Sequence, residues 1–327
     1  MIRKQIIATN ELDRQNQIIP IPVLNDMAVL ISTSEFATKM SVMHDATLLP
    51  VGKVISGELI DLENGIVALE TKIDDFMDDF KLILGPDDEP MYLGQSTIDF
   101  RPFTEHGESF EGELVVSLNP IDFSKQSYDE IIRYVTDSEM GEVESHAKKA
   151  AEPEIEILFS LATNFLLYLT AKKAFDKTAE KISEDIASGY DKVKRIVGFI
   201  FSRIAGKRTT TFVITGPNQV IELIIRCDSA ETFNKAMEEK DSGYIADTFE
   251  RYCQIFSDGI NKMQFLFNED TNKWELNYLT SNSGQVIGSE KCYKNTKRIY
   301  DQTLASPTAA FSLGATVTYQ VEEISDA

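Results

Sequence analysis

Four carboxylates within six residues are the first candidate for chemistry in this chain. The run Asp74-Asp75-Phe76-Met77-Asp78-Asp79 has a D-D-x-x-D spacing, which can hold Mg²⁺ and a diphosphate when it lies on a helix opposite a second acidic motif. Strand-like segments flank the run here, and charge runs are usually solvated surfaces. We therefore expect a solvated acidic turn. Weak Ca²⁺ binding is the alternative, although the D-x-[DN]-x-[DN]-G loop pattern is absent.

The histidines and cysteines do not favour a metal or cofactor site. All three histidines precede residue 147, whereas the cysteines are Cys227, Cys253 and Cys292. No ligand spacing typical of zinc occurs, and an odd number of cysteines does not describe a disulfide framework. The segment Gly206-Lys207-Arg208-Thr209 holds only a fragment of a phosphate-binding loop. We expect no metal, no cofactor, and thiols that are buried or inert.

One stretch of the N-terminal half places a histidine and a serine in strand-like contexts. The segment Met43-His44-Asp45, followed by Pro50-Val51-Gly52-Lys53-Val54, resembles the histidine segment of phage prohead (capsid-maturation) serine proteases. Further along, Leu93-Gly94-Gln95-Ser96-Thr97-Ile98 resembles the nucleophile strand of that family, and residues 114–120 resemble the strand after it. The resemblance covers roughly residues 40–125. It implies a small β-barrel in which Ser96 attacks a peptide carbonyl and His44 accepts its proton.

The acidic residue of this set departs from the family pattern. Val115 occupies the position where the resemblance expects a carboxylate, so Glu113 or Glu111 would have to orient His44. A serine and a histidine without an orienting acid do not form a triad. If the chain is a peptidase, its catalytic set is His44, Ser96 and Glu113. A catalytically inactive barrel and an accidental match are the other interpretations.

The elements that would position these residues are mostly strands. Short runs rich in β-branched and aromatic residues, separated by turn residues, predict strands over 51–60, 65–73, 80–84, 96–103 and 110–118. Strands at this spacing are typical of a small barrel or sandwich. A helical pattern follows over 127–150, and Pro153 ends it.

The middle of the chain reads as helical. Residues 157–171 carry no charge, and we expect a helix over 155–171 that forms a hairpin with a longer basic helix after it. The longer helix has one apolar stripe at intervals of three and four residues, made by Phe175, Ala179, Ile182, Ile186, Tyr190, Val193, Val197, Ile200 and Ile204. Such a stripe is a core face or, where one hairpin cannot cover it, a surface for self-association.

The C-terminal part has an α+β pattern. Strands over 209–215 and 220–227 form a hairpin, and Asp228-Ser229-Ala230-Glu231 resembles a helix cap that starts a helix over 229–240. A second helix is expected over 244–256, and a second hairpin over 263–267 and 274–279. Residues 301–314 read as a loop, and 317–321 as an edge strand.

The charge balance limits the possible partners. The net charge is −21 and the pI is about 4.6, which repels nucleic acid and favours cationic partners. The N-terminal residues lack an apolar run of signal-peptide length, and the uncharged run is too short to span a bilayer, so a cytoplasmic location is expected. Membrane attachment through the basic helix is a weaker alternative, since the global charge opposes it.

These patterns predict an α+β chain in three consecutive parts. A β-rich domain ending in a helix covers 1–150, a helical connector covers 151–208, and an α+β domain covers 209–327. The first hypothesis for function is a non-catalytic interaction or assembly protein that self-associates through its central helices, as a homo-oligomer or with another protein. The alternatives are a prohead-protease-like serine peptidase and a peripheral membrane protein.

Overall fold

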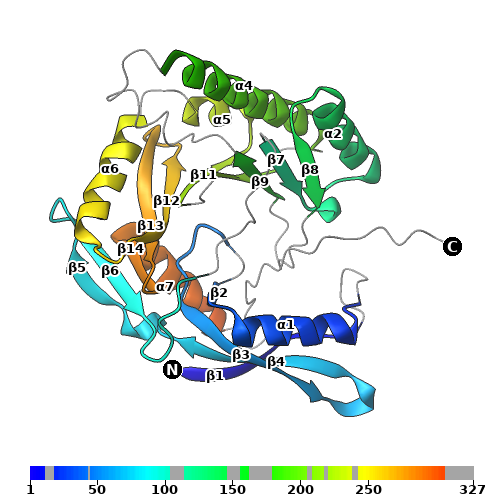
Figure 1. The fold of residues 1–327 in the computed structure, drawn as a ribbon, viewed down its shortest axis with the longest axis vertical. Coiled ribbons are helices and arrows are strands. Elements are labelled where there is room, and N and C mark those ends of the chain that lie inside the picture. The colour runs from blue at the N-terminus through cyan, green and yellow to red at the C-terminus, as the bar shows by residue number, and fades with distance from the viewer. Residues whose placement is uncertain are drawn as a thin grey trace. The chain divides into compact units, whose positions relative to one another are not determined.

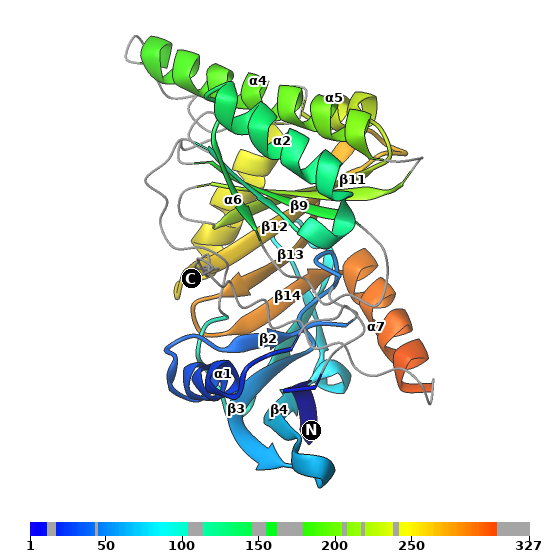
Figure 2. The same ribbon diagram turned by 90° about the vertical axis from the view of Figure 1, so that its right-hand side faces the viewer.

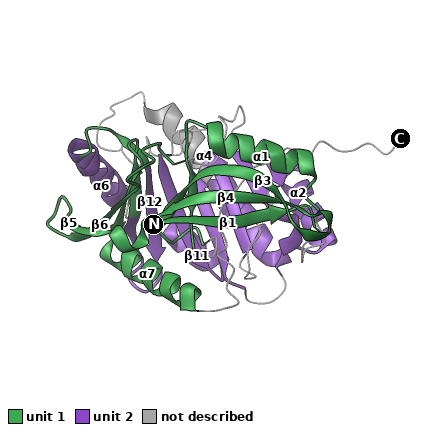
Figure 3. Ribbon diagram, turned by 90° about the horizontal axis from the view of Figure 1, so that it is seen from below, with its two compact units in different colours: residues 1–104, 256–261, 278–315 green, residues 105–255, 262–277, 316–327 purple. Residues whose placement is uncertain are grey.

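The computed structural model describes residues 1–11, 18–42, 45–103, 114–145, 155–161, 179–204, 208–216, 220–237 and 242–305 (Figure 1). Within these ranges helices and strands are mixed along the chain, which confirms the α+β class. Two compact units are present (Figure 3). Unit 1 consists of Met1–Thr104, Phe256–Asn261 and Tyr278–Ala315, and unit 2 consists of Glu105–Ile255, Lys262–Asn277 and Thr316–Ala327. Both are discontinuous in sequence, whereas the charge pattern divides the chain into three consecutive parts.

Unit 1 contains an antiparallel four-stranded sheet with the order β1-β4-β3-β2. Its strands are β1 (Ile2–Thr9), β2 (Thr38–Met40), β3 (Gly52–Asp61) and β4 (Val67–Asp75). The β3–β4 connection uses Asn64 and Gly65, both with positive φ, as the Asn-Gly pair predicts. Helix α1 (Ile21–Thr33) packs on β3 and β4. Gly57 allows this close packing, because a Cβ there would lie 3.2 Å from Cα of Ala28.

A second group of strands in unit 1 has the order β5-β6-β14. These strands are β5 (Lys81–Leu84), β6 (Pro90–Gln95) and β14 (Gln285–Ser289), and α7 (Glu290–Ala305) follows the last of them. Short 3₁₀ turns, η1 (Glu63–Gly65) and η2 (Met77–Asp79), lie beside β4. The buried core here consists of Leu49, Phe76, Phe103, Tyr278, Val286 and Cys292.

Unit 2 contains a mixed sheet with the order β12-β11-β10-β9-β7-β8. Its strands are β7 (Leu114–Leu118), β8 (Glu142–Ser145), β9 (Ile155–Leu161), β10 (Thr210–Thr215), β11 (Ile221–Cys227) and β12 (Ile260–Asn268), with β13 (Lys273–Ser281) beside β12. The chain passes between the units within β12 and within β13. A further 3₁₀ turn, η3 (Pro120–Asp122), follows β7.

Helices cover the apolar face of the unit 2 sheet. These are α2 (Lys125–Asp137), α4 (Ala179–Arg203), α5 (Ala230–Ala236) and α6 (Ser242–Ile255), and Figure 2 shows α2, α4 and α5 along one face. The ring of Phe212 on β10 contacts Phe201 and Phe233, and the ring of Tyr244 packs edge-on against Phe265. None of the described helices is both long enough and apolar enough to cross a membrane.

Three of the four described side chains of the apolar stripe are buried in the core, and Ile204 at its end is partly buried. Val193, Val197 and Ile200 are completely buried, and the ring of Phe199 on the same helix stacks on Tyr134 of α2. The helix itself is as expected. The part of α4 whose side chains are described packs inside unit 2, as expected if the stripe is a core face and not a surface for self-association.

Four expectations need correction. Residues 155–161 form the central strand β9, not the start of a helix, because β7 and β10 satisfy its backbone on both sides. Strand β6 ends at Gln95, so the strand expected over 96–103 is a loop. The helix expected over 127–150 ends at Asp137 and is followed by β8. Helix α7 occupies 290–305, where a loop was expected from 301. The edge strand at 317–321 lies outside the described residues.

Candidate functional site

Ser96 is the one member of the proposed catalytic set that the structure describes, and its hydroxyl is fully engaged. It lies directly after β6 and is 1% exposed. Its Oγ donates to Oδ2 of Asp74 at 2.6 Å and accepts from the backbone N–H groups of Asp99 at 2.8 Å and Ile98 at 3.2 Å. A hydroxyl has one proton and two lone pairs, so these contacts use its whole capacity. His44, Glu113 and Glu111 lie outside the described residues.

The acidic run is divided between the interior and the surface. Asp74 and Asp75 end β4 and are buried, so the expectation of a solvated turn is wrong for this pair, whereas Asp78 and Asp79 are exposed. Asp75 accepts a 2.6 Å hydrogen bond from the Tyr300 hydroxyl and pairs with Arg3 at 3.0 Å. Burial, together with the nearby Asp75 carboxylate, raises the pKa of Tyr300 well above its usual value.

These carboxylates have protein partners rather than a metal arrangement. Asp78 pairs with Lys297 of α7 at 3.1 Å. Among the residues described, no group of three or more His, Cys, Asp or Glu side chains is arranged to hold a metal ion. The run therefore joins β4 to α7 and to the segment after β6.

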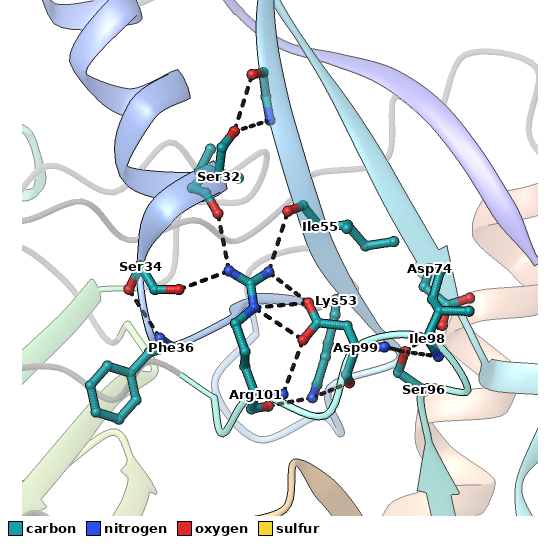
Figure 4. A network of polar contacts seen from close by, with 12 residues as sticks. Ser32, Ser34, Phe36, Lys53, Ile55, Asp74, Ser96, Ile98, Asp99 and Arg101 are labelled. Atoms are coloured by element: carbon teal, nitrogen blue, oxygen red, sulfur yellow. Dashed lines mark hydrogen bonds and ion pairs between the residues drawn. The ribbon is translucent and has the colours of Figure 1, made fainter.

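Side chains from several elements of unit 1 hydrogen-bond to that segment, residues 96–103, and we call it the braced loop. Arg101 ties it to the end of α1 (Figure 4). The guanidinium donates to the carbonyl oxygens of Ser34 at 2.9 Å and Ile31 at 3.3 Å, which belong to the last turn of α1 and its cap. A further N–H of the guanidinium reaches the carbonyl of Ile55 on β3 at 3.3 Å. A cation near the carboxyl end of a helix is also favoured by the helix dipole.

Asp99 completes the bracing from within the loop. Its carboxylate accepts hydrogen bonds from Nη2 of Arg101 at 2.6 Å and from Nε at 3.0 Å, and it also accepts from the backbone N–H of Arg101. Burial by itself would raise the pKa of Asp99, but the bonds and charge of Arg101, with the charge of Lys53, hold it below its ordinary value. The two side chains therefore form a charged pair with satisfied donors and acceptors.

Lys53 of β3 also hydrogen-bonds to the backbone of the braced loop. Its side chain is completely buried, and Nζ donates to the carbonyl oxygens of Asp99, at 2.8 Å, and Arg101. Nζ also lies 4.8 Å from the ring centroid of Phe103. Burial lowers the pKa of Lys53 to about 8, with the Asp99 carboxylate opposing the shift. The ammonium thus remains the main form at neutral pH and acts as a fixed donor to the loop backbone.

Neighbouring side chains in the middle of the braced loop alternate between buried contacts and exposure to solvent. Asp99 and Arg101 point toward the rest of unit 1 (Figure 4), whereas Ile98 is 53% exposed and Phe100 is 59% exposed. Phe36 lies two residues after Ser34, which Arg101 joins to the loop, and its side chain is also exposed. Rigid backbone therefore presents large apolar side chains to solvent, an arrangement that suits recognition rather than bond chemistry.

A second buried polar cluster lies on three neighbouring strands of unit 2. Nζ of Lys262 lies 3.3 Å from Oε1 of Glu222, and the Gln264 amide donates to the same oxygen. Asn277 donates to Oε1 of Gln264 at 2.5 Å. This cluster was not anticipated. Glu222 and Gln264 lie in predicted strands, and Lys262 lies just before the second of them, but this pattern is equally typical of a solvated strand face.

Comparison with known proteins found no matching family model, no similar curated protein and no similar solved structure. The relationship to prohead proteases therefore rests on the short motifs alone and stays a prediction.

Proposed function

We propose that this chain is a non-catalytic interaction protein that docks a partner protein on the apolar tip of the braced loop. The observation that carries the proposal is that hydrogen bonds hold the backbone of this loop while Ile98 and Phe100 are exposed. An exposed loop usually carries polar or small residues, and apolar side chains there are unfavourable unless something covers them. Their rigid support implies that the covering is done by a partner.

The energetic argument is one of pre-organisation. Binding requires that interface side chains and loops lose conformational freedom, which costs about 0.5–1.5 kcal/mol for each immobilised side chain and more for a mobile backbone. Arg101, Lys53 and Ser96 have already fixed the backbone of this loop. An aromatic ring such as Phe100 also contributes large contact area with few rotatable bonds.

The expected partner carries apolar residues flanked by cations. The chain has a net charge of −21, and Glu35 lies exposed next to Phe36. This field repels acidic proteins and nucleic acid at long range and steers basic surfaces toward the loop. The central helix is a poorer candidate for this role, because Val193, Val197 and Ile200 are buried inside unit 2.

A site-specific photocrosslinker tests the proposal. Benzoylphenylalanine in place of Phe100 preserves an aromatic side chain, and the full chain is then irradiated in the cells that normally produce it. We expect one discrete adduct from this position. The matched control is the same substitution at Ile121, which is 51% exposed on η3 of unit 2 and should give no adduct of that mass.

The second part of this experiment repeats the crosslinking in a variant whose braced loop has lost hydrogen bonds to α1. Arg101→Met removes the bonds to the end of α1 while leaving Ile98 and Phe100 in the sequence. The adduct from position 100 should fall several-fold in this background, because the loop loses its fixed conformation. Adducts of equal yield from positions 100 and 121, or none from either, would contradict the docking role.

A further inference from the structure

Strand β5 lies at one edge of its sheet and carries exposed leucines. Leu82 is 62% exposed and Leu84 is 67% exposed, and within the described part of the chain β6 is the only strand that pairs with β5. Natural edge strands are usually protected by inward-pointing charges, prolines or bulges. The only charge within β5 is Lys81, at its first position.

The register of the β5–β6 hairpin determines which backbone groups face outward. The N–H of Gly85 donates to the carbonyl of Glu89, and hydrogen-bonded pairs alternate along an antiparallel ladder. The pairs Lys81–Leu93 and Ile83–Met91 are therefore the hydrogen-bonded ones. Leu84 lies opposite Pro90, which has no N–H to offer. The N–H and C=O groups of Leu82 and Leu84 thus point to the open edge.

Two such edges are complementary to each other. If two copies of β5 run antiparallel about a two-fold axis at Ile83, Leu82 of one copy lies opposite Leu84 of the other. Each such pair exchanges two backbone hydrogen bonds through the outward groups, and the leucines of both copies gather on one face. Ile83 then lies opposite its own copy on the other face.

The charges at the ends of β5 match in the same register. Lys81 of one copy lies opposite Gly85 of the other. A Cβ at Gly85 would lie 2.2 Å from Oε1 of Glu89, so this carboxylate fills the space where a side chain at position 85 would stand. The carboxylate is held there by the N–H of Asp87 at 2.7 Å. Lys81 can therefore pair with Glu89 of the other copy, twice in each dimer.

We infer that the chain forms a two-fold symmetric dimer by antiparallel pairing of β5 with β5 of a second copy. The inference is independent of the docking loop, because no residue of β5 belongs to it. The contact is short, so a dimer that dissociates on dilution is expected rather than a permanent one.

A cysteine at the two-fold axis tests the register directly. In the intact chain with Cys253→Ser, which removes the exposed native thiol, Ile83→Cys should form a disulfide-linked dimer under mild oxidation, because residue 83 faces its own copy. Leu82→Cys should crosslink several-fold less, since it faces Leu84. Leu30→Cys, at a leucine of α1 that is 55% exposed, is the matched control and should form no disulfide-linked dimer.

Sedimentation equilibrium with charge variants tests the association itself. Leu84→Lys should weaken the dimer at least tenfold, whereas Leu30→Lys should leave it unchanged. Lys81→Glu and Glu89→Lys should each weaken it, and the double variant should recover most of the loss. A strict monomer at several hundred micromolar would overturn the inference. So would a dimer that is indifferent to Leu84→Lys, or Ile83→Cys crosslinking no better than Leu30→Cys.

Discussion

Single residues in this chain show how a side chain of a catalytically competent type can have a structural role instead. A serine in a G-x-S-like setting invites a nucleophile interpretation, yet the Ser96 hydroxyl donates to Asp74 and accepts two backbone N–H groups. A nucleophilic serine needs both a base within hydrogen-bonding reach and an oxygen lone pair that is free to attack. The Asp74 carboxylate at the end of β4 accepts the hydrogen bond of Ser96, but the two backbone N–H groups occupy both lone pairs of the oxygen.

We expect that the intact protein does not react with a fluorophosphonate probe at Ser96, because the hydroxyl is buried and both lone pairs of its oxygen already accept backbone hydrogen bonds. Ser96→Ala should instead lower the free energy of unfolding by about 1–3 kcal/mol, since Asp74 and two amides lose a buried partner. Labelling followed by mass spectrometry, and urea unfolding with Ser202→Ala as the exposed control, check the two statements. Labelling that vanishes in Ser96→Ala would restore the peptidase hypothesis.

The lowered pKa of Lys53 predicts that the free energy of unfolding changes at alkaline pH. Its pKa is lowered from 10.5 to about 8 in the folded chain. Between these values the unfolded chain binds one more proton than the folded chain, so this group adds stability as pH rises. The gain should be on the order of 3 kcal/mol by pH 10.5.

The measurement is urea unfolding of the parent chain and of Lys53→Met from pH 7 to 10.5. Below pH 8 the difference between the two free energies of unfolding should be constant. Above pH 8 it should grow in favour of the parent chain. Two curves that stay parallel up to pH 10.5 would show that Lys53 titrates normally.

Among the helices and strands, the sequence predicted those whose position depends on the local pattern of turn residues and apolar periodicity. The β10–β11 hairpin and α4 lie where turn residues and helical periodicity place them. The cap sequence predicted the start of α5 to within one residue: the helix begins at Ala230 instead of 229, and Ser229 caps it by accepting from the N–H of Thr232 at 3.2 Å. These features depend on contacts between residues close in the chain.

Elements stabilised by distant contacts were missed. The uncharged run that begins within β9 has a composition that also suits a buried helix, and pairing with β7 and β10 makes residues 155–161 a strand. Helix α7 buries Cys292, Thr296, Tyr300 and Thr303 instead of an aliphatic stripe, so its apolar periodicity is weak. The sequence did not predict the braced loop for a similar reason. Lys53 and Arg101 donate to backbone carbonyl oxygens, and because every residue has one, no residue type identifies these acceptors.

The cap of α5 gives a test at this scale. Ser229→Ala should lower the free energy of unfolding by about 1 kcal/mol, because the first turn of the helix loses an acceptor for a free N–H group. Ser229→Asp keeps an acceptor at the cap and should retain most of the stability. Denaturant unfolding compares the three chains, and a Ser229→Ala variant as stable as the parent chain would mean that the cap contact contributes nothing.

At the scale of the whole molecule, charge and apolar surface act against each other in self-association. Each copy carries a net charge of −21, and two copies repel over the distance that salt leaves unscreened, roughly 30 Å at 0.01 M and 8 Å at 0.15 M. The Lys81–Glu89 pairs attract, but exposed ion pairs contribute only about 0–1 kcal/mol each. Leucine burial changes little over this range of salt.

Repulsion between so many like charges should therefore dominate the salt dependence of the β5 dimer. We expect the dissociation constant to fall several-fold as NaCl rises from about 0.02 M to 0.15 M, because the Debye length shortens from well over 10 Å to about 8 Å. Sedimentation equilibrium at the two concentrations measures it, with Leu84→Lys as the variant in which apolar contact is lost. If added salt instead weakened the dimer, the paired charges at the ends of β5, rather than its leucines and backbone, would be the main source of its stability.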